Sequence, residues 1–219
     1  MEDFRPKFLS GIVGQDAVVT RLQDLANGVR TGRIIPPNLL LHGPPGIGKT
    51  TAARAFAREV LGEHFDNSFF QLRASDDRGI GVVRDGIIPL SRLPPKRGAP
   101  FRVFFFDEAD ALEPAVQSAL RSAMEEGWGT SVFILACNDL GMISVPMRSR
   151  CTILEFLLVP TEAMRHLLGR IVAEGQLPID GTEVGSIVER SQGIPREAIK
   201  LLVEAIGRAI PRRDAAPTS

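Results

Sequence analysis

The spacing of apolar residues changes along this chain and divides it into two parts. Before residue 160, short and nearly continuous apolar runs predict buried strands at 38–42, 69–73, 101–106 and 131–136. Between them, apolar residues recur every three or four positions, which predicts helices at 16–29, 51–61, 82–93 and 115–126. Pro89 should break or kink the third of these helices, because proline lacks an N–H. Strands alternating with helices favour an α/β fold, in which helices cover both faces of a parallel sheet.

After residue 160 only the helical spacing remains. It predicts three helices separated by glycine or proline, at 161–174, 182–191 and 195–210. We therefore expect an α/β domain at residues 1–159, a small three-helix domain at 160–211 and a flexible polar tail at 212–219.

The overall composition excludes several classes of protein. Apolar residues make up 44% and charged residues 24% of the 219 residues, as in ordinary globular proteins. The 26 basic and 26 acidic residues cancel, so any contact with nucleic acid must come from a local patch. Two cysteines without metal-ligand spacing, no signal peptide and no run of about 18 apolar residues indicate a reducing setting without a membrane. We expect a cytoplasmic protein, or a nuclear one if the cell is eukaryotic.

The strongest chemical signal is a match to the phosphate-binding pattern G-x-x-x-x-G-K-[ST] at Gly43-Pro44-Pro45-Gly46-Ile47-Gly48-Lys49-Thr50. Its glycines let backbone N–H groups face phosphate oxygens, and the following helix adds its N-terminal dipole. Lys49 would reach the β- and γ-phosphates of ATP, and Thr50 would hold Mg²⁺. The alternative is a Gly/Pro turn that ends in Lys-Thr by chance. The position of the segment between a predicted strand and a predicted helix favours the P-loop.

Polar residues at two strand ends extend this prediction. Asp107 and Glu108 follow the apolar run 101–106, where Asp107 can hold magnesium and Glu108 can orient and polarise the attacking water. A solvated strand end is the alternative. Asn138 follows the run 131–136 and could hydrogen-bond the water or the γ-phosphate, although asparagine is common at strand ends. Arg150 and Arg196 are candidate phosphate contacts or surface residues.

The order of these and other motifs resembles the small subunits of clamp loaders of the replication factor C type, within the AAA+ ATPases. The resemblance covers residue 4 to about residue 205. It rests on the P-loop and on Phe4-Arg5-Pro6, Ile12-Val13-Gly14-Gln15, Ala74-Ser75-Asp76-Asp77-Arg78-Gly79-Ile80, Val82-Val83-Arg84, Asp107-Glu108-Ala109-Asp110-Ala111-Leu112, Gln117-Ser118-Ala119-Leu120-Arg121, Cys137-Asn138 and Ser149-Arg150-Cys151.

The resemblance implies an AAA+ domain followed by a helical lid, and it assigns roles to residues. Asn138 would be the sensor-1 residue, Arg196 would sit at sensor 2, and Arg150 would be the arginine finger that completes a neighbouring subunit's site. With Lys49, Glu108 and Asn138, Arg150 completes the implied catalytic set. The nucleotide would contact the following residues: Val13, Gly14, Pro45, Gly46, Ile47, Gly48, Lys49, Thr50, Thr51, Asn138 and Arg196.

The resemblance also implies partners. Arg78 and Arg84 correspond to positions that approach the DNA backbone, or they are arginines on a solvated helix face. Residues 86–93 correspond to the part that touches the sliding clamp, through an exposed stripe of Ile87, Ile88 and Leu90; a stripe facing the core is the alternative.

The implied function is an ATP-binding and ATP-hydrolysing subunit of a DNA sliding-clamp loader, with Mg²⁺ as cofactor. It would use ATP to help open the clamp and place it on primer–template DNA, together with other loader subunits. The family's C-terminal collar does not follow the lid in this sequence, so we expect the chain alone to be a monomer or a weak oligomer that hydrolyses ATP slowly.

Two departures from the family pattern carry expectations of their own. Ile47 replaces the usual threonine of the P-loop, and we expect its side chain to point outward. Gly193-Ile194-Pro195-Arg196 replaces the usual Gly-Asp-Met-Arg, which changes the surroundings of sensor 2.

Three other functions were weighed. A branch-migration motor would carry a winged-helix domain after the lid. A DEAD-box helicase, whose box is spelled by residues 107–110, would need a second strand-rich lobe. A nucleotide-locked scaffold subunit of a loader would bind ATP without turnover, and the intact Lys49, Thr50, Asp107 and Glu108 argue against it.

Overall fold

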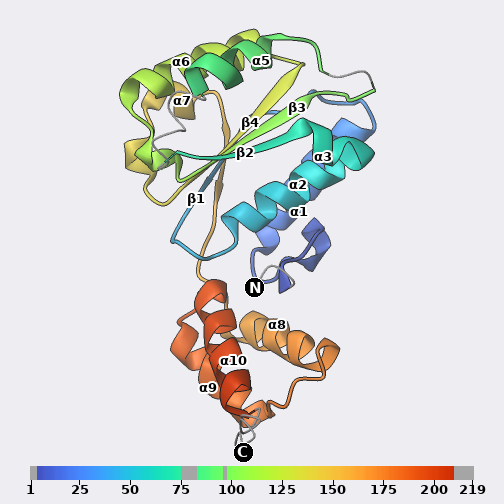
Figure 1. Cartoon of the computed structure of the whole chain (residues 1–219), viewed down its shortest axis with the longest axis vertical. Coiled ribbons are helices and arrows are strands. Elements are labelled where there is room, and N and C mark those ends of the chain that lie inside the picture. The colour runs from blue at the N-terminus through green and yellow to red at the C-terminus, as the bar shows by residue number, and fades with distance from the viewer. Residues whose placement is uncertain (1–3, 75–82, 96–97, 210–219) are drawn as a thin grey trace, which may run out of the picture.

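A computed structural model describes residues 4–74, 83–95 and 98–209 of the chain (Figure 1). Within them, five strands form one sheet in the order β2-β3-β4-β1-β5, and every neighbouring pair is parallel. The strands are β1 (Leu39–His42), β2 (Phe69–Arg73), β3 (Arg102–Asp107), β4 (Ser131–Cys137) and β5 (Thr152–Glu155). The predicted parallel α/β fold is therefore confirmed. Strand β5 was not predicted, because in this short edge strand Leu154 alone is buried and the apolar signal is weak.

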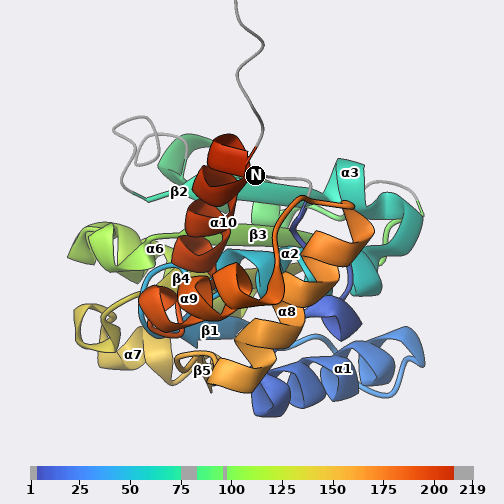
Figure 2. The ribbon, with the colours of Figure 1, turned by 90° about the horizontal axis from the view of Figure 1, so that it is seen from below.

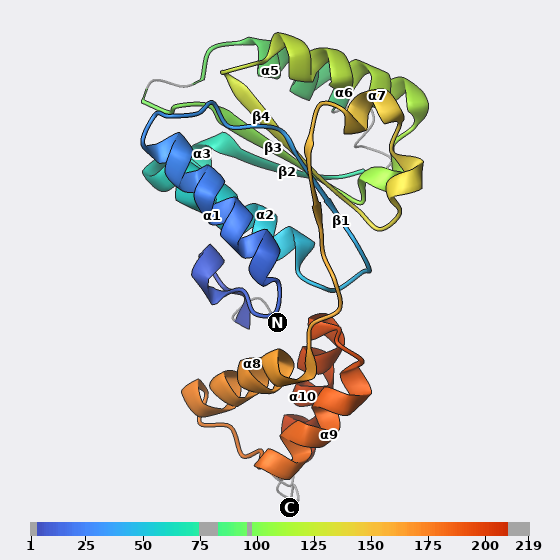
Figure 3. The same cartoon turned by 180° about the vertical axis from the view of Figure 1, so that it is seen from behind.

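Helices cover both faces of the sheet because successive strand residues point to opposite sides. Leu39, Leu41, Val103 and Phe105 pack on the face covered by α1 (Asp16–Arg30), α2 (Lys49–Leu61) and α3 (Phe65–Ser68). Leu40, Phe104, Phe106 and Phe133 pack on the other face, which is covered by α5 (Ile88–Arg92) and α6 (Pro114–Glu126). Figure 3 shows the two helical layers on either side of the strands, with α7 (Val145–Arg148) beside α6.

The segment around Pro89 behaves as the proline predicts. A π-helical turn at Val83–Ile87 ends just before α5, whose first turn contains Pro89. Ile87 and Ile88 are buried against the sheet, and Leu90 packs on the same cluster. The expected exposed stripe is therefore wrong, and the stripe faces the core. These side chains fill the space between α6 and the sheet.

The described chain ends in a separate helical layer that lies below the sheet in Figure 1 and in front of it in Figure 2, where the molecule is seen from below. It consists of α8 (Thr161–Glu174), α9 (Gly181–Ser191) and α10 (Pro195–Ala209), close to the predicted ranges. These helices share their own apolar core, which includes Met164, Leu168, Ile187 and Leu202. We call this part the lid.

A few main-chain contacts join the lid to the sheet domain. The N–H of Val159 donates to the Gly193 oxygen at 2.9 Å. The side chain of Gln15 makes two hydrogen bonds to the main chain of Leu157, donating to its oxygen at 2.6 Å and accepting from its nitrogen at 3.2 Å. Gln15 is buried, so its amide needs hydrogen-bond partners inside the protein. The segment that leads into the lid supplies a partner for both the nitrogen and the oxygen of this amide.

Candidate nucleotide-binding site

The predicted P-loop joins β1 to α2 at the carboxyl edge of the parallel sheet, where such folds bind ligands. Gly43 has φ 141°, and a Cβ there would lie 2.2 Å from the Phe156 oxygen, so no other residue fits. Gly48 has φ 107° and precedes the first residue of α2, and a Cβ there would meet open space. Within the described chain, no side chain caps this end of α2. The backbone N–H groups of the first turn of α2 therefore point to a place where an anion can bind.

Lys49 points back over the loop. Its Nζ donates to the Gly43 oxygen at 2.6 Å, the Pro44 oxygen at 2.8 Å and the Asn138 Oδ1 at 3.0 Å. Burial lowers the pKa of Lys49 below its ordinary value, while the nearby Cys137, Asp107 and Asp110 act in the opposite direction. A buried cation at this place is costly without an anion, and phosphate would supply one.

The two predicted magnesium ligands lie side by side. The Thr50 hydroxyl donates to Asp107 Oδ2 at 2.8 Å. Both groups are oxygen donors of the kind that Mg²⁺ prefers, on adjacent elements β3 and α2. Glu108 follows Asp107 in a left-handed conformation, φ 56° and ψ 41°, and its side chain is exposed. Such a conformation is uncommon for a glutamate and turns the chain sharply away from the strand.

Asn138 completes the group at the end of β4. Its side-chain oxygen accepts the bond from Lys49, and its backbone N–H donates to Asp110 Oδ2 at 3.0 Å. The structure therefore brings Lys49, Thr50, Asp107 and Asn138 together at one edge of the sheet. The chemistry of these donors fits a Mg²⁺–nucleotide: a cation and helix N–H groups for the phosphates, and oxygen ligands for the metal.

The lid reaches the same loop. The N–H of Arg196, in the first turn of α10, donates to the Gly46 oxygen at 3.2 Å, and its charge contributes to lowering the pKa of Lys49. Gly14 lies against the segment entering the lid, since a Cβ on it would be 2.6 Å from Val159 Cγ1. Val13 packs on the lid core. The lid thus contacts both the P-loop and the N-terminal arm.

Ile47 differs from the expectation. Its side chain is 2% exposed and belongs to the core beneath α2, so it points inward. The loop turns the Ile47 side chain beneath itself, where burial stabilises an apolar residue. Of the other expected contacts, Pro45 is exposed and Thr51 is half-buried in the first turn of α2.

Arg150 lies apart from this group, just after α7 on the layer that covers the other face of the sheet. Its guanidinium bonds to Glu125 of α6 through Nε and Nη2, and to the Pro146 oxygen at 2.9 Å through Nη1. Within the described chain no hydrogen bond or ion pair joins it to Lys49 or Asn138, so the structure does not bring Arg150 to the P-loop of its own chain.

Of the two predicted DNA contacts, one lies within the residues that the structure describes. Arg78 lies outside the described residues. For Arg84 the structure places the backbone in the π-helical turn before α5 and nothing further.

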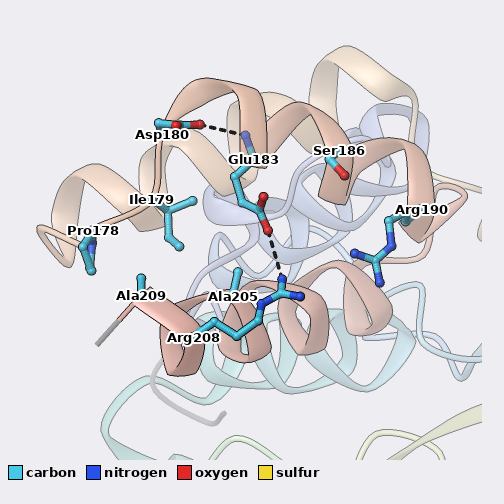
Figure 4. Close-up of a pocket in the computed structure, with 9 residues that line it drawn as sticks. All are labelled: Pro178, Ile179, Asp180, Glu183, Ser186, Arg190, Ala205, Arg208 and Ala209. Atoms are coloured by element: carbon cyan, nitrogen blue, oxygen red, sulfur yellow. Dashed lines mark hydrogen bonds and ion pairs between the residues drawn. The ribbon is translucent and has the colours of Figure 1, made fainter. Parts of the chain in front are cut away.

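A second hollow lies within the lid, between α9 and α10 (Figure 4). Arg208 bonds Glu183 across it at 3.0 Å, and Asp180 accepts from the Glu183 N–H at 2.8 Å. Arg208 is twelve residues beyond Arg196 on α10, or about 18 Å along the axis at 1.5 Å per residue. This hollow is therefore distinct from the P-loop site.

The described chain shows neither a cluster of metal-ligating side chains nor a membrane-spanning helix. No group of three or more His, Cys, Asp or Glu side chains could hold a metal ion there. Within the same residues, every helix is too short or too polar to cross a membrane.

Sequence reasoning did not assign roles to Asp110 and Gln15, although both lie in motifs that carry the resemblance. Asp110 follows the end of β3 and Gln15 precedes α1, and only the folded chain shows which main-chain groups they bond.

Comparisons with known proteins agree with this geometry. Residues 39–158 match the ATPase family associated with various cellular activities (AAA). The chain is 41% identical to the replication factor C small subunit of Archaeoglobus fulgidus over 212 residues, and 42% identical to that of Methanoculleus marisnigri over 214 residues. These matches cover 96% and 98% of this chain, which spans 65% and 64% of the two relatives.

Among solved structures, the RuvB Holliday junction branch migration motor of Thermotoga maritima is similar, with a TM-score of 0.74 and 28% identity. The similarity covers 90% of this chain and 63% of RuvB. The expected resemblance to replication factor C small subunits is confirmed by the relatives, and the expected AAA fold is confirmed by the family match and the sheet order. This chain belongs to the AAA family of ATPases.

Proposed function

We propose that the chain is the ATP-binding and ATP-hydrolysing subunit of a DNA sliding-clamp loader. The observation that carries the proposal is the meeting of Lys49, Thr50, Asp107 and Asn138 at the carboxyl edge of the sheet. The similarity to replication factor C small subunits supports the clamp-loading role, since the chain shares about 40% of its residues with them along nearly its whole length. Such a subunit would work where the chromosome lies, in the cytoplasm or in a nucleus.

The residues divide the work of hydrolysis. Lys49 and the N–H groups of the first turn of α2 would hold the β- and γ-phosphates of ATP, and Thr50 and Asp107 would hold Mg²⁺, which neutralises charge that develops on the phosphates. Glu108 would orient and polarise the attacking water, and Asn138 would hydrogen-bond the water or the γ-phosphate. Val13 and Gly14 would lie beside the adenine.

The contact between Arg196 and Gly46 suggests how nucleotide state reaches the lid. Since α10 starts against the P-loop, phosphate held there would act on the lid through Arg196. The lid has its own apolar core, which begins at Val159 and supports a domain boundary close to residue 159 and a rigid-body movement of the helices α8 to α10.

Arg150 would serve the site of a neighbouring subunit. The support is its position after α7, with its guanidinium bound to Glu125 and not to the P-loop of its own chain. Other loader subunits, the clamp and primer–template DNA are the partners, with Arg78 and Arg84 as the proposed DNA contacts.

Two substitutions test the proposal, with ATP affinity and turnover measured in parallel on the chain and its partner subunits. Lys49→Ala should lose binding, because the charge that faces the phosphates is removed. Glu108→Gln should keep ATP but lose turnover, because the water-polarising carboxylate alone is changed. Normal turnover by Glu108→Gln would contradict the proposal and favour another base.

A branch-migration motor is the second candidate, favoured by the structural similarity to RuvB. Stimulation of turnover distinguishes the two. A clamp-loader subunit responds to primer–template DNA together with a sliding clamp, whereas a branch-migration motor responds to four-way junctions without a clamp. A nucleotide-locked scaffold would bind ATP and respond to neither.

A further inference from the structure

Asp110 links the loops that follow two neighbouring strands. It lies in the 3₁₀ turn Ala109–Ala111 just after β3 and Glu108. Its Oδ2 accepts from the backbone N–H of Asn138 at 3.0 Å and from that of Asp139 at 3.4 Å. Both donors belong to the loop after β4.

The Asp110 contact lies beyond the point where β3 and β4 are hydrogen-bonded to each other. The β3–β4 ladder has its last pair at Phe106 and Leu135, and beyond it β4 pairs with β1 through Ala136 and Cys137. Glu108 and Asn138 therefore both lie past the end of their mutual ladder. A carboxylate that accepts two N–H groups is a charge-assisted contact and restores the connection there.

The same contact helps to position Glu108 and Asn138, the two residues proposed to act on the attacking water. Asn138 is oriented by its backbone bond to Asp110 and by the bond from Lys49 to its side chain. Glu108 is two residues from Asp110 and enters the turn in a left-handed conformation. Moving the Asp110 carboxylate would therefore alter the spacing between Glu108 and Asn138.

We propose that Asp110 is a positioning residue for ATP hydrolysis, which fixes Asn138 relative to Glu108 by accepting the backbone N–H groups of residues 138 and 139. This inference rests on the proposed function. Asp110 does not touch the nucleotide in this assignment, so its loss should affect turnover and spare binding.

The test uses Asp110→Ala, Asp110→Asn and the control Glu113→Ala. Asparagine keeps an acceptor oxygen but loses the charge. Glu113 offers an exposed carboxylate in the same loop, and within the described chain that carboxylate makes no hydrogen bond or ion pair. Should Asp110→Ala fail to fold, Asp110→Ser, whose hydroxyl is too short to reach, replaces it. Turnover is measured at concentrations where the wild type is active, with ATP affinity and amide hydrogen exchange alongside.

We expect Asp110→Ala to reduce kcat, by as much as about 100-fold if the misplacement reaches 1 Å, with ATP affinity little changed. The amides of residues 138 and 139 should exchange faster in this variant. Asp110→Asn should recover most of the turnover and of the protection, and Glu113→Ala should match the wild type.

Unchanged amide exchange in Asp110→Ala, or unchanged kcat, would overturn the inference. Asp110→Asn that keeps the amide protection but loses turnover like Asp110→Ala would assign the effect to charge and also contradict it. A wild type that binds ATP without turnover under any condition would contradict the proposed function instead, and the exchange of the two amides would still test the contact.

Discussion

The P-loop edge and the surface around Arg150 each hold a basic side chain, but the two side chains have different partners. At the P-loop, buried Lys49 bonds to its own loop and to Asn138, and Thr50 bonds to Asp107. At the other surface, half-buried Arg150 is held by Glu125 and a main-chain oxygen. The P-loop contacts are all made within one chain, and Arg150 lies outside them, bound to Glu125 and to the Pro146 oxygen. We therefore propose that nucleotide binding is local and that fast hydrolysis depends on a neighbour.

The largest expected effect is at the P-loop. Lys49→Ala removes the cation that faces the phosphates, so ATP binding should fall below detection in titration calorimetry. Lys200→Ala is the matched control, since Lys200 lies on the lid and pairs with Glu197 on its own helix. Equal ATP affinity of the Lys49 variant and the wild type would contradict the claim that the P-loop edge binds ATP through Lys49.

The next effect is on rate. Arg150→Ala should leave ATP affinity unchanged and lower turnover of the assembled protein by roughly 10³- to 10⁵-fold, the range found for arginine fingers. If Arg150 acts on a neighbouring site as proposed, mixing Arg150→Ala with Glu108→Gln chains should restore part of the activity. No recovery in any mixture, with assembly verified by light scattering, would assign Arg150 a structural role.

A smaller effect concerns stability and contrasts one apolar residue from each region. Ile47→Val removes a methyl group from the core under the P-loop and should lower the free energy of unfolding by about 0.5–1.5 kcal/mol. Val145→Ala, 67% exposed at the start of α7, should change it by less than about 0.5 kcal/mol. Urea denaturation measures both. Equal losses would mean that the P-loop core is no better packed than the outer surface.

The smallest effect uses one thiol from each region. Burial raises the pKa of Cys137, beside Asn138, to about 11, and that of Cys151, beside Arg150, to about 12. Both thiols stay protonated in the folded chain at pH 8, so iodoacetamide should label them much more slowly than in urea.

The pH dependence of stability has a definite sign. The unfolded thiols ionise near 9.0 while the folded ones stay neutral, so the free energy of unfolding should fall as pH rises above about 9. Native labelling as fast as in urea would show that these regions open readily.

Much of this arrangement could be predicted because its signals are local. Continuous apolar runs gave four strands, and the P-loop pattern identified Lys49 and Thr50. Residues whose role depends on a distant partner could not be predicted. The inward side chain of Ile47, the buried stripe of Ile87 and Ile88 and the short edge strand β5 each depend on what packs against them. The bonds of Asp110 to the loop after β4 depend on strand order, which local spacing does not carry.

The most direct test of the central claim is ATP binding and turnover per chain, measured with light scattering over a wide range of protein concentrations and with added partner subunits. The account predicts nucleotide binding that is independent of concentration and turnover that rises steeply as assemblies form. Hydrolysis by a proven monomer at the rate of the assembled protein would contradict it, because the site would then be complete without a neighbour's Arg150.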